Sequence, residues 1–443
     1  MTGKEGIGLC ILLTFFFSAC STTSSQMQPR KAEPRKVVMI SVDGLLPEFY
    51  LDDSFNAPTL KSLVKGGAYA SAAIPVYPSM TFPNHASIVT GVRSAKHGIL
   101  SNTIFVPKKG PTRDWYWDSK HLKVPAIWDA ARAAGKKVAV FAWPVSVGAK
   151  VDWLVPEVFS AKGIDHVQNW KLMLRHTDPR LMAELISASR VKTIRSNLDY
   201  DRWTADASLH VLKAYHPDLL LLHFRTLDDE QHHTGRASKS AKAALTRIDA
   251  LIGELVAAID FKDTVLIITG DHGFENAERT IDVNAVLAKG GWLTTDGRKI
   301  REWQAIAHGN SGQAAIYGDP KQANAIVAHL QEHAEGHYRV ITAAQLKEHG
   351  AFPDAICAID PAEGYSLGFL GLSAEPKPGQ LRGQHGALAS PMLSTGLVVY
   401  GAGIVPKKNL GQVHILDIAP TIAEQMRISF PATDGHSLPI SVQ

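Results

Sequence analysis

Three short apolar runs in this chain each end just before side chains that can bind metal ions. Short runs rich in Val, Leu and Ile are typical of buried β-strands. In an open α/β sheet, functional groups gather in the crevice outside the carboxyl ends of the strands, so these side chains are expected to meet there. The runs are Val37–Val42, Leu219–Phe224 and Val265–Ile268; they precede Asp43, then Asp228 with His232, then Asp271 with His272, and His385 follows later in a Gly-Gln-His-Gly segment.

Helical patterns separate these strands and indicate the fold class. Before the third run, apolar residues recur at steps of three and four, which places them on one face of a long amphipathic helix. An earlier helix is expected to begin at a cap on Asn56 and to stop at Gly66-Gly67. The alternation predicts an α/β fold, with a central, mostly parallel sheet between helix layers. The apolar positions of the long helix are Leu245, Ile248, Ile252, Leu255 and Ile259.

Two stretches follow this alternation less well. The first covers about residues 107–201, is rich in Trp and is broken by several prolines. The second covers about residues 275–382. We expect both to be insertions that fold over the crevice as caps.

The N-terminus has the three-part layout of a secretory signal. Lys4 precedes an apolar stretch, Ile7–Phe17, which is too short to span a bilayer. Small residues then lead to Cys20, in an arrangement that resembles a bacterial lipobox, where the cysteine becomes lipidated. We therefore expect a signal peptide at 1–19, a polar tether at 20–36, and an exported periplasmic or outer-membrane lipoprotein anchored to a membrane through Cys20. A secreted protein is the alternative.

Charge and cysteine content exclude some classes of partner and bond. The chain has 46 basic and 42 acidic residues, and its formal net charge is +4. These charges are spread along the chain without the basic blocks of a nucleic-acid-binding surface, so no nucleic-acid polymer is indicated as a partner. With Cys10 in the signal and Cys20 as the anchor, Cys357 is left alone, and we expect no disulfide.

Each candidate ligand cluster has an ordinary explanation when it is taken alone. An Asp-x-x-x-His pair such as the one at Asp228 is usually solvated surface, Asp271-His272 can be a capped turn, and His385 can be a loop histidine. Their succession after strand ends, together with Asp43, favours a metal site. A mixed set of oxygen and nitrogen ligands suits Zn²⁺ better than Ca²⁺ or Mg²⁺.

Two further motifs carry a resemblance to a known family. Thr81 lies in a Thr-Phe-Pro-Asn-His segment, and Asn102 ends a His-Gly-Ile-x-x-Asn segment. Both are similar to motifs of the nucleotide pyrophosphatase/phosphodiesterase family, in the alkaline phosphatase superfamily. The resemblance runs from about Val37 to Asp434-Gly435. It implies an alkaline-phosphatase-like catalytic domain over residues 37–443.

The resemblance also implies a mechanism, namely a two-zinc hydrolase that cleaves phosphodiester or pyrophosphate bonds in small phosphate esters, nucleotides or related esters. Thr81 would attack phosphorus to give a phospho-threonine that water then cleaves, and Asn102, with a backbone N–H near Thr81, would donate to a phosphate oxygen. Metal coordination would activate the threonine hydroxyl, which is otherwise a poor nucleophile. The implied ligands are Asp228, His232 and His385 for one zinc, and Asp43, Asp271, His272 and Thr81 for the other.

Two positions depart from the family pattern. Five residues before Asp228, the family commonly has an aromatic side chain that packs on the nucleobase, and this chain has His223. Gln231 stands where glycine usually precedes the motif histidine. The first departure leaves the nucleotide preference open. We expect His223 and Phe82, which follows the nucleophile, to contact the substrate.

Other functions stay open on the same frame. A phosphomonoesterase, or a hydrolase of phospholipid head groups or phosphonates, would use the same two metal ions. An arginine that contacts a second edge of the phosphate group would favour a monoester substrate. The sequence alone does not show whether Arg93 or Arg225 makes such a contact. A sulfatase is disfavoured because the segment around Thr81 lacks the Cys/Ser-x-Pro-x-Arg pattern. In a different class, a non-catalytic scaffold lipoprotein would bind zinc without turnover.

Overall fold

The computed structural model describes residues 1–3, 6, 35–161, 165–297, 299–370, 373–388 and 390–441. The region from residue 34 to residue 443 forms one compact unit. Cys20, most of the expected signal peptide and nearly all of the expected tether lie outside the described residues. Within the described ranges, no helix is both long enough and apolar enough to cross a membrane.

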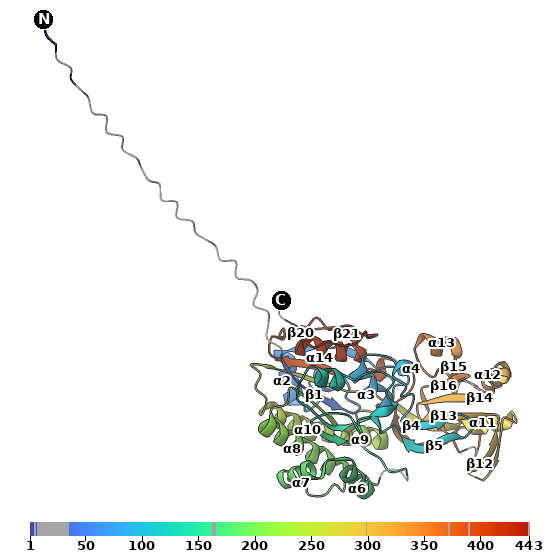
Figure 1. The fold of residues 1–443 in the computed structure, drawn as a ribbon. Coiled ribbons are helices and arrows are strands. Elements are labelled where there is room, and N and C mark those ends of the chain that lie inside the picture. The colour runs from blue at the N-terminus through green and yellow to red at the C-terminus, as the bar shows by residue number, and fades with distance from the viewer. Residues whose placement is uncertain are drawn as a thin grey trace. The chain divides into compact units, whose positions relative to one another are not determined.

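An eight-stranded, mostly parallel sheet forms the centre of the fold, which confirms the expected fold class (Figure 1). β1 lies between β8 and β9 and runs parallel to both, and the parallel pairing continues through β6 to β7. β19 is antiparallel to β9. In spatial order the strands are β20 (Lys408–Asn409), β2 (Ala68–Tyr69), β19 (Leu397–Gly401), β9 (Thr264–Thr269), β1 (Lys36–Val42), β8 (Leu219–Phe224), β6 (Val138–Trp143) and β7 (Trp153–Pro156).

Helices cover both faces of this sheet, and β1 shows why. Val38 and Ile40 belong to the core on one face, whereas Val37 and Met39 belong to the core on the other, as the two-residue period of a strand requires. Because both faces are covered, every residue of β1 after Lys36 is buried. The first face packs against α2 (Pro58–Gly66), α8 (Asn197–Tyr215) and α10 (Lys239–Val256), and the second against α3 (Thr81–Thr90), α5 (Ile127–Ala133) and α14 (Ile418–Met426).

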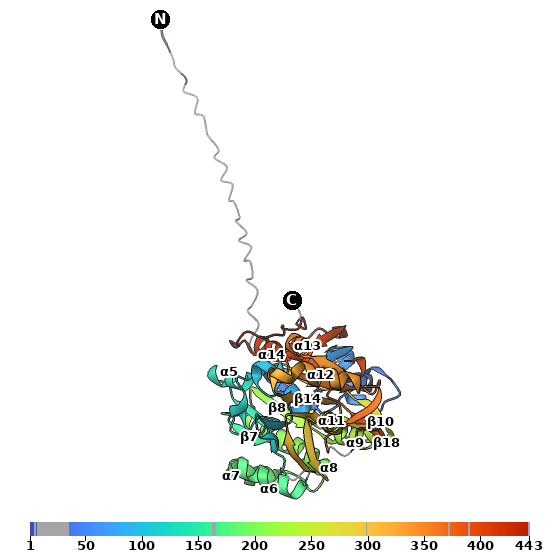
Figure 2. The same cartoon turned by 90° about the vertical axis from the view of Figure 1, so that its right-hand side faces the viewer.

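A smaller lobe with its own apolar core follows β9 and corresponds to the second expected insertion. It lies to the right of the central sheet in Figure 1 and faces the viewer in Figure 2. An antiparallel sheet in the order β13-β14-β16-β15 forms its centre. The elements are β10 (Glu275–Asp282), α11 (Val283–Lys289), β11 (Leu293–Asp296), β12 (Lys299–Trp303), β13 (Ala305–Asn310), β14 (Gln313–Gly318), α12 (Ala323–Glu332), β15 (Tyr338–Thr342), α13 (Ala343–Glu348), β16 (Cys357–Pro361), β17 (Gly364–Gly368) and β18 (Lys377–Gln384).

The first expected insertion, residues 107–201, is not a single cap. Its β6 and β7 belong to the central sheet, and α5 covers one face of that sheet. Pro156 ends β7, which is the edge strand, where proline is tolerated. The prolines interrupt the sequence pattern of this stretch, although strands of the central sheet continue through it. The other elements of this stretch and the remaining short ones are α1 (Glu48–Leu51), β3 (Ala72–Ile74), α4 (Ser94–His97), β4 (Thr103–Val106), β5 (Gly110–Trp115), α6 (His166–His176), α7 (Pro179–Ala188), α9 (Thr226–Thr234) and β21 (Gln412–His414).

The start of α2 differs from the expectation of a cap on Asn56. The capping position is Ala57, whose side chain makes no capping hydrogen bond. Instead Asp249, from the middle of α10, accepts hydrogen bonds from the backbone N–H groups of Thr59 and Leu60, each at 2.9 Å. Asp249 is buried, so this carboxylate joins two helices on one face of the sheet.

Replacing Asp249 with alanine should lower the free energy of unfolding by about 2 kcal/mol, because two helix N–H groups lose a buried acceptor. Urea denaturation of the purified chain measures this change. Asp260→Ala is the matched control, since that exposed carboxylate accepts only from Lys262 N–H, and its effect should stay under about 0.5 kcal/mol. Equal effects of the two substitutions would contradict the capping role.

Candidate metal centre and active site

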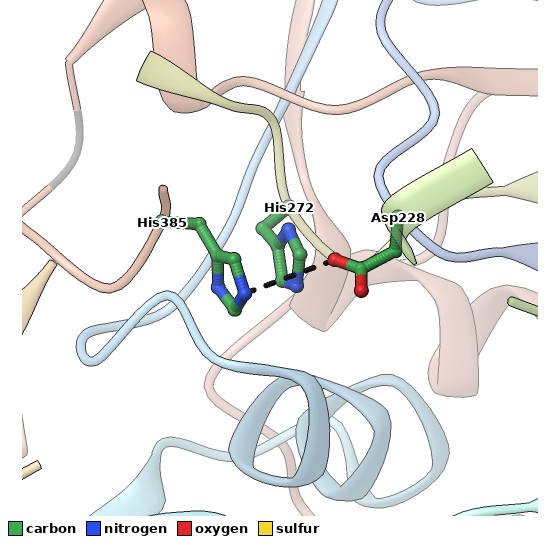
Figure 3. Close-up of side chains that lie close together, drawn as sticks. All are labelled: Asp228, His272 and His385. Atoms are coloured by element: carbon green, nitrogen blue, oxygen red, sulfur yellow. Dashed lines mark ion pairs between the residues drawn. The ribbon is translucent and has the colours of Figure 1, made fainter. Parts of the chain in front are cut away.

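Four segments place candidate ligands at the carboxyl end of the sheet. Asp43 follows β1, Asp228 lies in the first turn of α9 just after β8, and Asp271 follows β9. His385 follows β18, which is held in place by antiparallel pairing with β10. Figure 3 shows Asp228, His272 and His385 pointing toward one another from three different segments.

Asp228, His232 and His385 form a first cluster. The Nε2 atoms of the two histidines are 3.1 Å apart. Asp228 Oδ1 lies 3.4 Å from His232 Nε2. It lies 3.8 Å from His385 Nε2, a contact that Figure 3 marks with a dashed line. The structure thus brings three expected ligands together, with one potential donor atom of each facing the same small volume.

Asp43, Asp271 and His272 form a second cluster. His272 Nε2 lies 3.1 Å from Asp271 Oδ2 and 3.3 Å from Asp43 Oδ1. The His272 ring also stacks on the His385 ring, with centroids 3.5 Å apart. His272 therefore lies between the clusters, and its ligand atom groups with Asp228 and His385 as well as with Asp43 and Asp271.

Backbone carbonyls orient the histidine rings of both clusters. The Nδ1 atoms of His232, His272 and His385 lie 3.0, 3.2 and 2.8 Å from the carbonyl oxygens of Gly383, Gly273 and Ser79, respectively. A carbonyl can only accept, so each Nδ1 carries the proton and donates it. In a neutral ring this tautomer leaves the Nε2 lone pair available to a metal ion, which at His272 would take the place of a second proton.

Two carboxylates of the centre, Asp43 and Asp271, are buried, and the third, Asp228, is half-buried. Asp43 Oδ1, Asp228 Oδ1 and Asp271 Oδ2 accept no hydrogen bond from any described residue. Burial raises the pKa of Asp43 well above its ordinary value, and the nearby Asp228 and Asp271 raise it further. Burial opposes protonation of His272, yet Asp271 and Asp43 raise its pKa to about 9. Three carboxylate oxygens that accept no hydrogen bond lie beside the imidazole nitrogens. This mixed set of oxygen and nitrogen donors fits divalent cations.

Thr81 stands beside this centre. It is the first residue of α3, and its Oγ1 lies 3.4 Å from His272 Nε2. Asn102 lies close by, because its Oδ1 accepts a hydrogen bond of 3.0 Å from the backbone N–H of Phe82. The structure thus places a hydroxyl next to both ligand clusters and a side-chain amide at the same end of α3.

His85 supports the helix start and is not placed as a ligand. Its Nε2 lies 2.9 Å from Ser41 Oγ, and its Nδ1 lies 2.8 Å from the carbonyl oxygen of Thr81. Burial and the neighbouring His223 lower the pKa of His85 to about 3, so the ring is neutral at physiological pH. It holds the first turn of α3 against the end of β1.

His223 was expected to contact the substrate, but the structure places it in the interior. The side chain is completely buried, with Nδ1 2.7 Å from Glu157 Oε2 and Nε2 3.3 Å from Asp43 Oδ2. A ring enclosed between two carboxylates has no surface to offer a substrate, and it positions Asp43 instead. Glu157 escaped the sequence analysis, although its place directly after β7 follows the same rule of acids at strand ends.

Phe82 also has no exposed surface, which does not support direct contact with a substrate. Its ring lies 5.3 Å from that of Trp115 and 6.3 Å from that of Phe159. Trp115 and Phe159 stack on each other at 4.5 Å. Trp115 is only half-buried, so this tryptophan is the aromatic side chain of the group that reaches the surface beside Thr81.

Comparison with known proteins agrees with this arrangement. A family model described as type I phosphodiesterase/nucleotide pyrophosphatase matches residues 37–369. Human ectonucleotide pyrophosphatase/phosphodiesterase family member 1 is 26% identical over 270 residues, which cover 58% of this chain and 25% of that protein. Venom phosphodiesterase of Naja atra is 24% identical over 268 residues, covering 58% of this chain and 28% of that protein. The chain thus spans about a quarter of the length of these relatives.

Solved structures share the fold over a larger part of the chain. Human ectonucleotide pyrophosphatase/phosphodiesterase 5 has a TM-score of 0.66 at 20% identity, with 90% of this chain and 97% of that chain covered. An inactive threonine-to-alanine variant of the murine protein, in complex with AMP, has the same TM-score and coverage at 18% identity. These similarities establish an alkaline-phosphatase-like fold.

Replacing Asp228 with alanine should lower the metal content of the zinc-loaded chain by about one ion, because the first cluster loses its carboxylate. The neighbouring Asp229→Ala is the matched control. Asp229 lies in the same helical turn but pairs at 3.7 Å with the exposed His233, so its loss should leave the metal content unchanged. Elemental analysis after dialysis measures both, and equal metal content in the two variants would contradict the ligand role of Asp228.

Proposed function

The chain belongs to the type I phosphodiesterase/nucleotide pyrophosphatase family, and we propose that it hydrolyses phosphodiester or pyrophosphate bonds in small phosphate esters, nucleotides or related esters. One observation carries the proposal: the Thr81 hydroxyl stands at the start of α3, 3.4 Å from His272 Nε2 and beside both ligand clusters. A hydroxyl at a centre of this kind is suited to nucleophilic attack on phosphorus.

Two Zn²⁺ ions per chain are part of this proposal. The orphaned carboxylate oxygens and the free imidazole nitrogens of the centre supply the mixed donors that zinc prefers. Bound zinc would lower the pKa of a hydroxyl and neutralise charge on the phosphoryl group. The residues that would hold the ions are Asp228, His232 and His385 for the first, and Asp43, Asp271, His272 and the Thr81 hydroxyl for the second.

The proposed reaction has two steps. Thr81 Oγ attacks phosphorus, so that an Oγ–P bond forms while the bond from phosphorus to the leaving oxygen breaks. The product of this step is a phospho-threonine. Water then attacks phosphorus and releases the hydroxyl of Thr81. The N-terminus of α3 is a favourable place for the anionic phosphoryl group, because helix N-termini attract negative charge.

Asn102 is proposed to stabilise charge that develops on a phosphate oxygen. Its Oδ1 is already engaged by the Phe82 N–H in the first turn of α3. That hydrogen bond fixes the orientation of the amide and leaves Nδ2 as a donor. A donor held in place before the reaction stabilises the transition state without having to reorganise.

Relatives support a nucleotide-type substrate. Matched proteins are named ectonucleotide pyrophosphatase/phosphodiesterases and venom phosphodiesterases, and one structural neighbour was solved in complex with AMP. We extend phosphate-ester hydrolysis to this chain on that basis. His223 replaces the expected aromatic residue and is buried, so any stacking on a base would fall to another side chain, with Trp115 the nearest candidate.

The alternative functions gain less support. Arg93 does not support a monoesterase, because its groups are engaged elsewhere. Its guanidinium Nη1 lies 3.5 Å from the carbonyl oxygen of His349, and its backbone N–H donates to Asp434 Oδ2. A non-catalytic scaffold would not need a nucleophilic hydroxyl beside its metal ligands, and Thr81 is placed there.

Thr81→Ala should lower turnover of bis-p-nitrophenyl phosphate by at least about a thousandfold, because the attacking oxygen is lost. Metal content should be retained, since six other ligands remain. Thr81→Ser keeps a hydroxyl and should retain measurable turnover. The assay compares both variants with the parent chain on this diester and on p-nitrophenyl phosphate, with a chelator control. Full turnover by Thr81→Ala would remove Thr81 from the mechanism, and a preference of the parent chain for the monoester would overturn the substrate class.

Export and membrane anchoring through Cys20 are proposed from the N-terminal sequence alone. In bacterial cells that express the full chain, Cys20→Ser should abolish incorporation of labelled palmitate and move the protein from the membrane fraction to the soluble fraction. Unchanged labelling of the Cys20→Ser chain would contradict the anchor.

A further inference from the structure

Arg225 is a buried cation whose guanidinium has no hydrogen-bond acceptor among the described residues. It directly follows β8 and occupies the capping position of α9. Only 6% of the residue is exposed, and among the described residues none provides an acceptor for its Nε, Nη1 or Nη2 atoms. A guanidinium has five N–H donors, and leaving them unsatisfied in the interior is strongly unfavourable. Such an arrangement requires a functional explanation.

Neighbouring groups stabilise only the faces of the Arg225 guanidinium. Its Cζ lies 3.7 Å from the centroid of the Tyr200 ring and 5.2 Å from that of the Phe159 ring, which are cation–π contacts. The nearest acids are occupied: Asp201 accepts from the backbone N–H groups that follow β8, and Glu157 is bonded to His223. No residue that the structure describes therefore accepts a hydrogen bond from the N–H edges of the guanidinium.

Other polar atoms around Arg225 also lack partners. Tyr200 Oη is buried and makes no hydrogen bond with any described residue. His166 Nδ1 is in the same condition, and after burial the charge of Arg225 is the next cause that lowers the pKa of His166. We call Arg225, Tyr200 and His166 the Arg225 cluster. Two further polar groups that lack a hydrogen bond beside a buried cation indicate a binding site for an anion.

The Arg225 cluster is connected to the active centre in two ways. Along the chain, Arg225 occupies the capping position of α9, and Asp228 lies in the first turn of that helix. Through side chains, Phe159 under Arg225 stacks on Trp115, and Trp115 contacts Phe82, the residue after Thr81. Phe159 is 8% exposed, so the guanidinium that it covers lies just beneath the surface.

We infer that Arg225 recognises a second anionic group of the substrate, a phosphate or a carboxylate carried by the leaving group. The inference rests on the proposed function and specifies its substrate class: esters in which the leaving group carries its own negative charge. The planar guanidinium matches such an oxyanion with two parallel hydrogen bonds. Arg225 would determine specificity through this contact and would take no part in bond cleavage.

Two substrates with the same nucleoside test this assignment. Thymidine triphosphate has an anionic leaving group, whereas p-nitrophenyl thymidine monophosphate has an uncharged aromatic one. Arg225→Met should lower the ratio of kcat/KM for the triphosphate to kcat/KM for the nitrophenyl ester by at least about tenfold. Arg225→Lys keeps the charge but not the paired geometry, and should give an intermediate ratio. A third substrate, the 4-carboxyphenyl ester of thymidine monophosphate, has a leaving group that carries a carboxylate. If Arg225→Met loses kcat/KM on this ester and on the triphosphate, Arg225 recognises any oxyanion. If kcat/KM falls on the triphosphate alone, Arg225 recognises phosphate.

Arg236→Met is the matched control for the same comparison. Arg236 lies just beyond the other end of α9, and its Nη1 and Nη2 atoms donate hydrogen bonds of 2.7 and 2.6 Å to the carboxylate of Glu48. Its loss should leave the substrate ratio within about twofold. If Arg225→Met does not fold, Arg225→Lys decides, because an unchanged ratio in that variant overturns the inference.

Four results would contradict the assignment. An unchanged ratio in Arg225→Met, or a parallel loss on both substrates at an unchanged melting temperature, would show that Arg225 only supports the structure. An equal shift in Arg236→Met would show that the effect is not specific to the cluster. Turnover of neither substrate by the zinc-loaded parent chain would overturn the proposed function and this inference with it, whereas turnover with an unchanged ratio would overturn this inference alone.

Discussion

The mutual repulsion of three carboxylates is the constraint on which the rest of the centre depends. Asp43 and Asp271 are buried at one end of the sheet and Asp228 is half-buried beside them, and each has an oxygen that accepts no hydrogen bond from a described residue. Taking charged groups out of water is unfavourable unless opposite charge compensates them. The histidines supply part of that compensation, and divalent cations would supply the remainder. The arrangement of these carboxylates and histidines is thus explained by the divalent cations that it is suited to bind.

Sheet topology brings these groups together from distant parts of the chain. β1 lies between β8 and β9, and Ser41 near its end is in register with His223 on one side and Thr269 on the other. Residues that follow three parallel strands therefore emerge side by side. His385 arrives differently, because the smaller lobe returns the chain to the crevice through β18. The lobe thus supplies a ligand to the centre, in addition to its own core.

Local patterns in the sequence were enough to predict three strands of the central sheet (β1, β8 and β9), the fold class and the candidate ligands that follow these strands, because burial and strand period are encoded in neighbouring residues. Features that depend on distant partners were not predictable in this way. Asn56 was expected to cap α2, but Asp249 from α10 does so. His223 was expected to contact substrate, but Glu157 and Asp43 enclose it. Nothing around Arg225 in the sequence indicates that its guanidinium is buried without an acceptor.

The most direct test of the central claim is anomalous X-ray scattering from crystals of the zinc-loaded chain, with data collected above and below the zinc absorption edge. The account predicts two anomalous peaks about 4 Å apart. One should lie among Asp228, His232 and His385, and the other among Asp43, Asp271 and His272 next to Thr81. A single peak, or peaks away from these side chains, would contradict a two-metal centre.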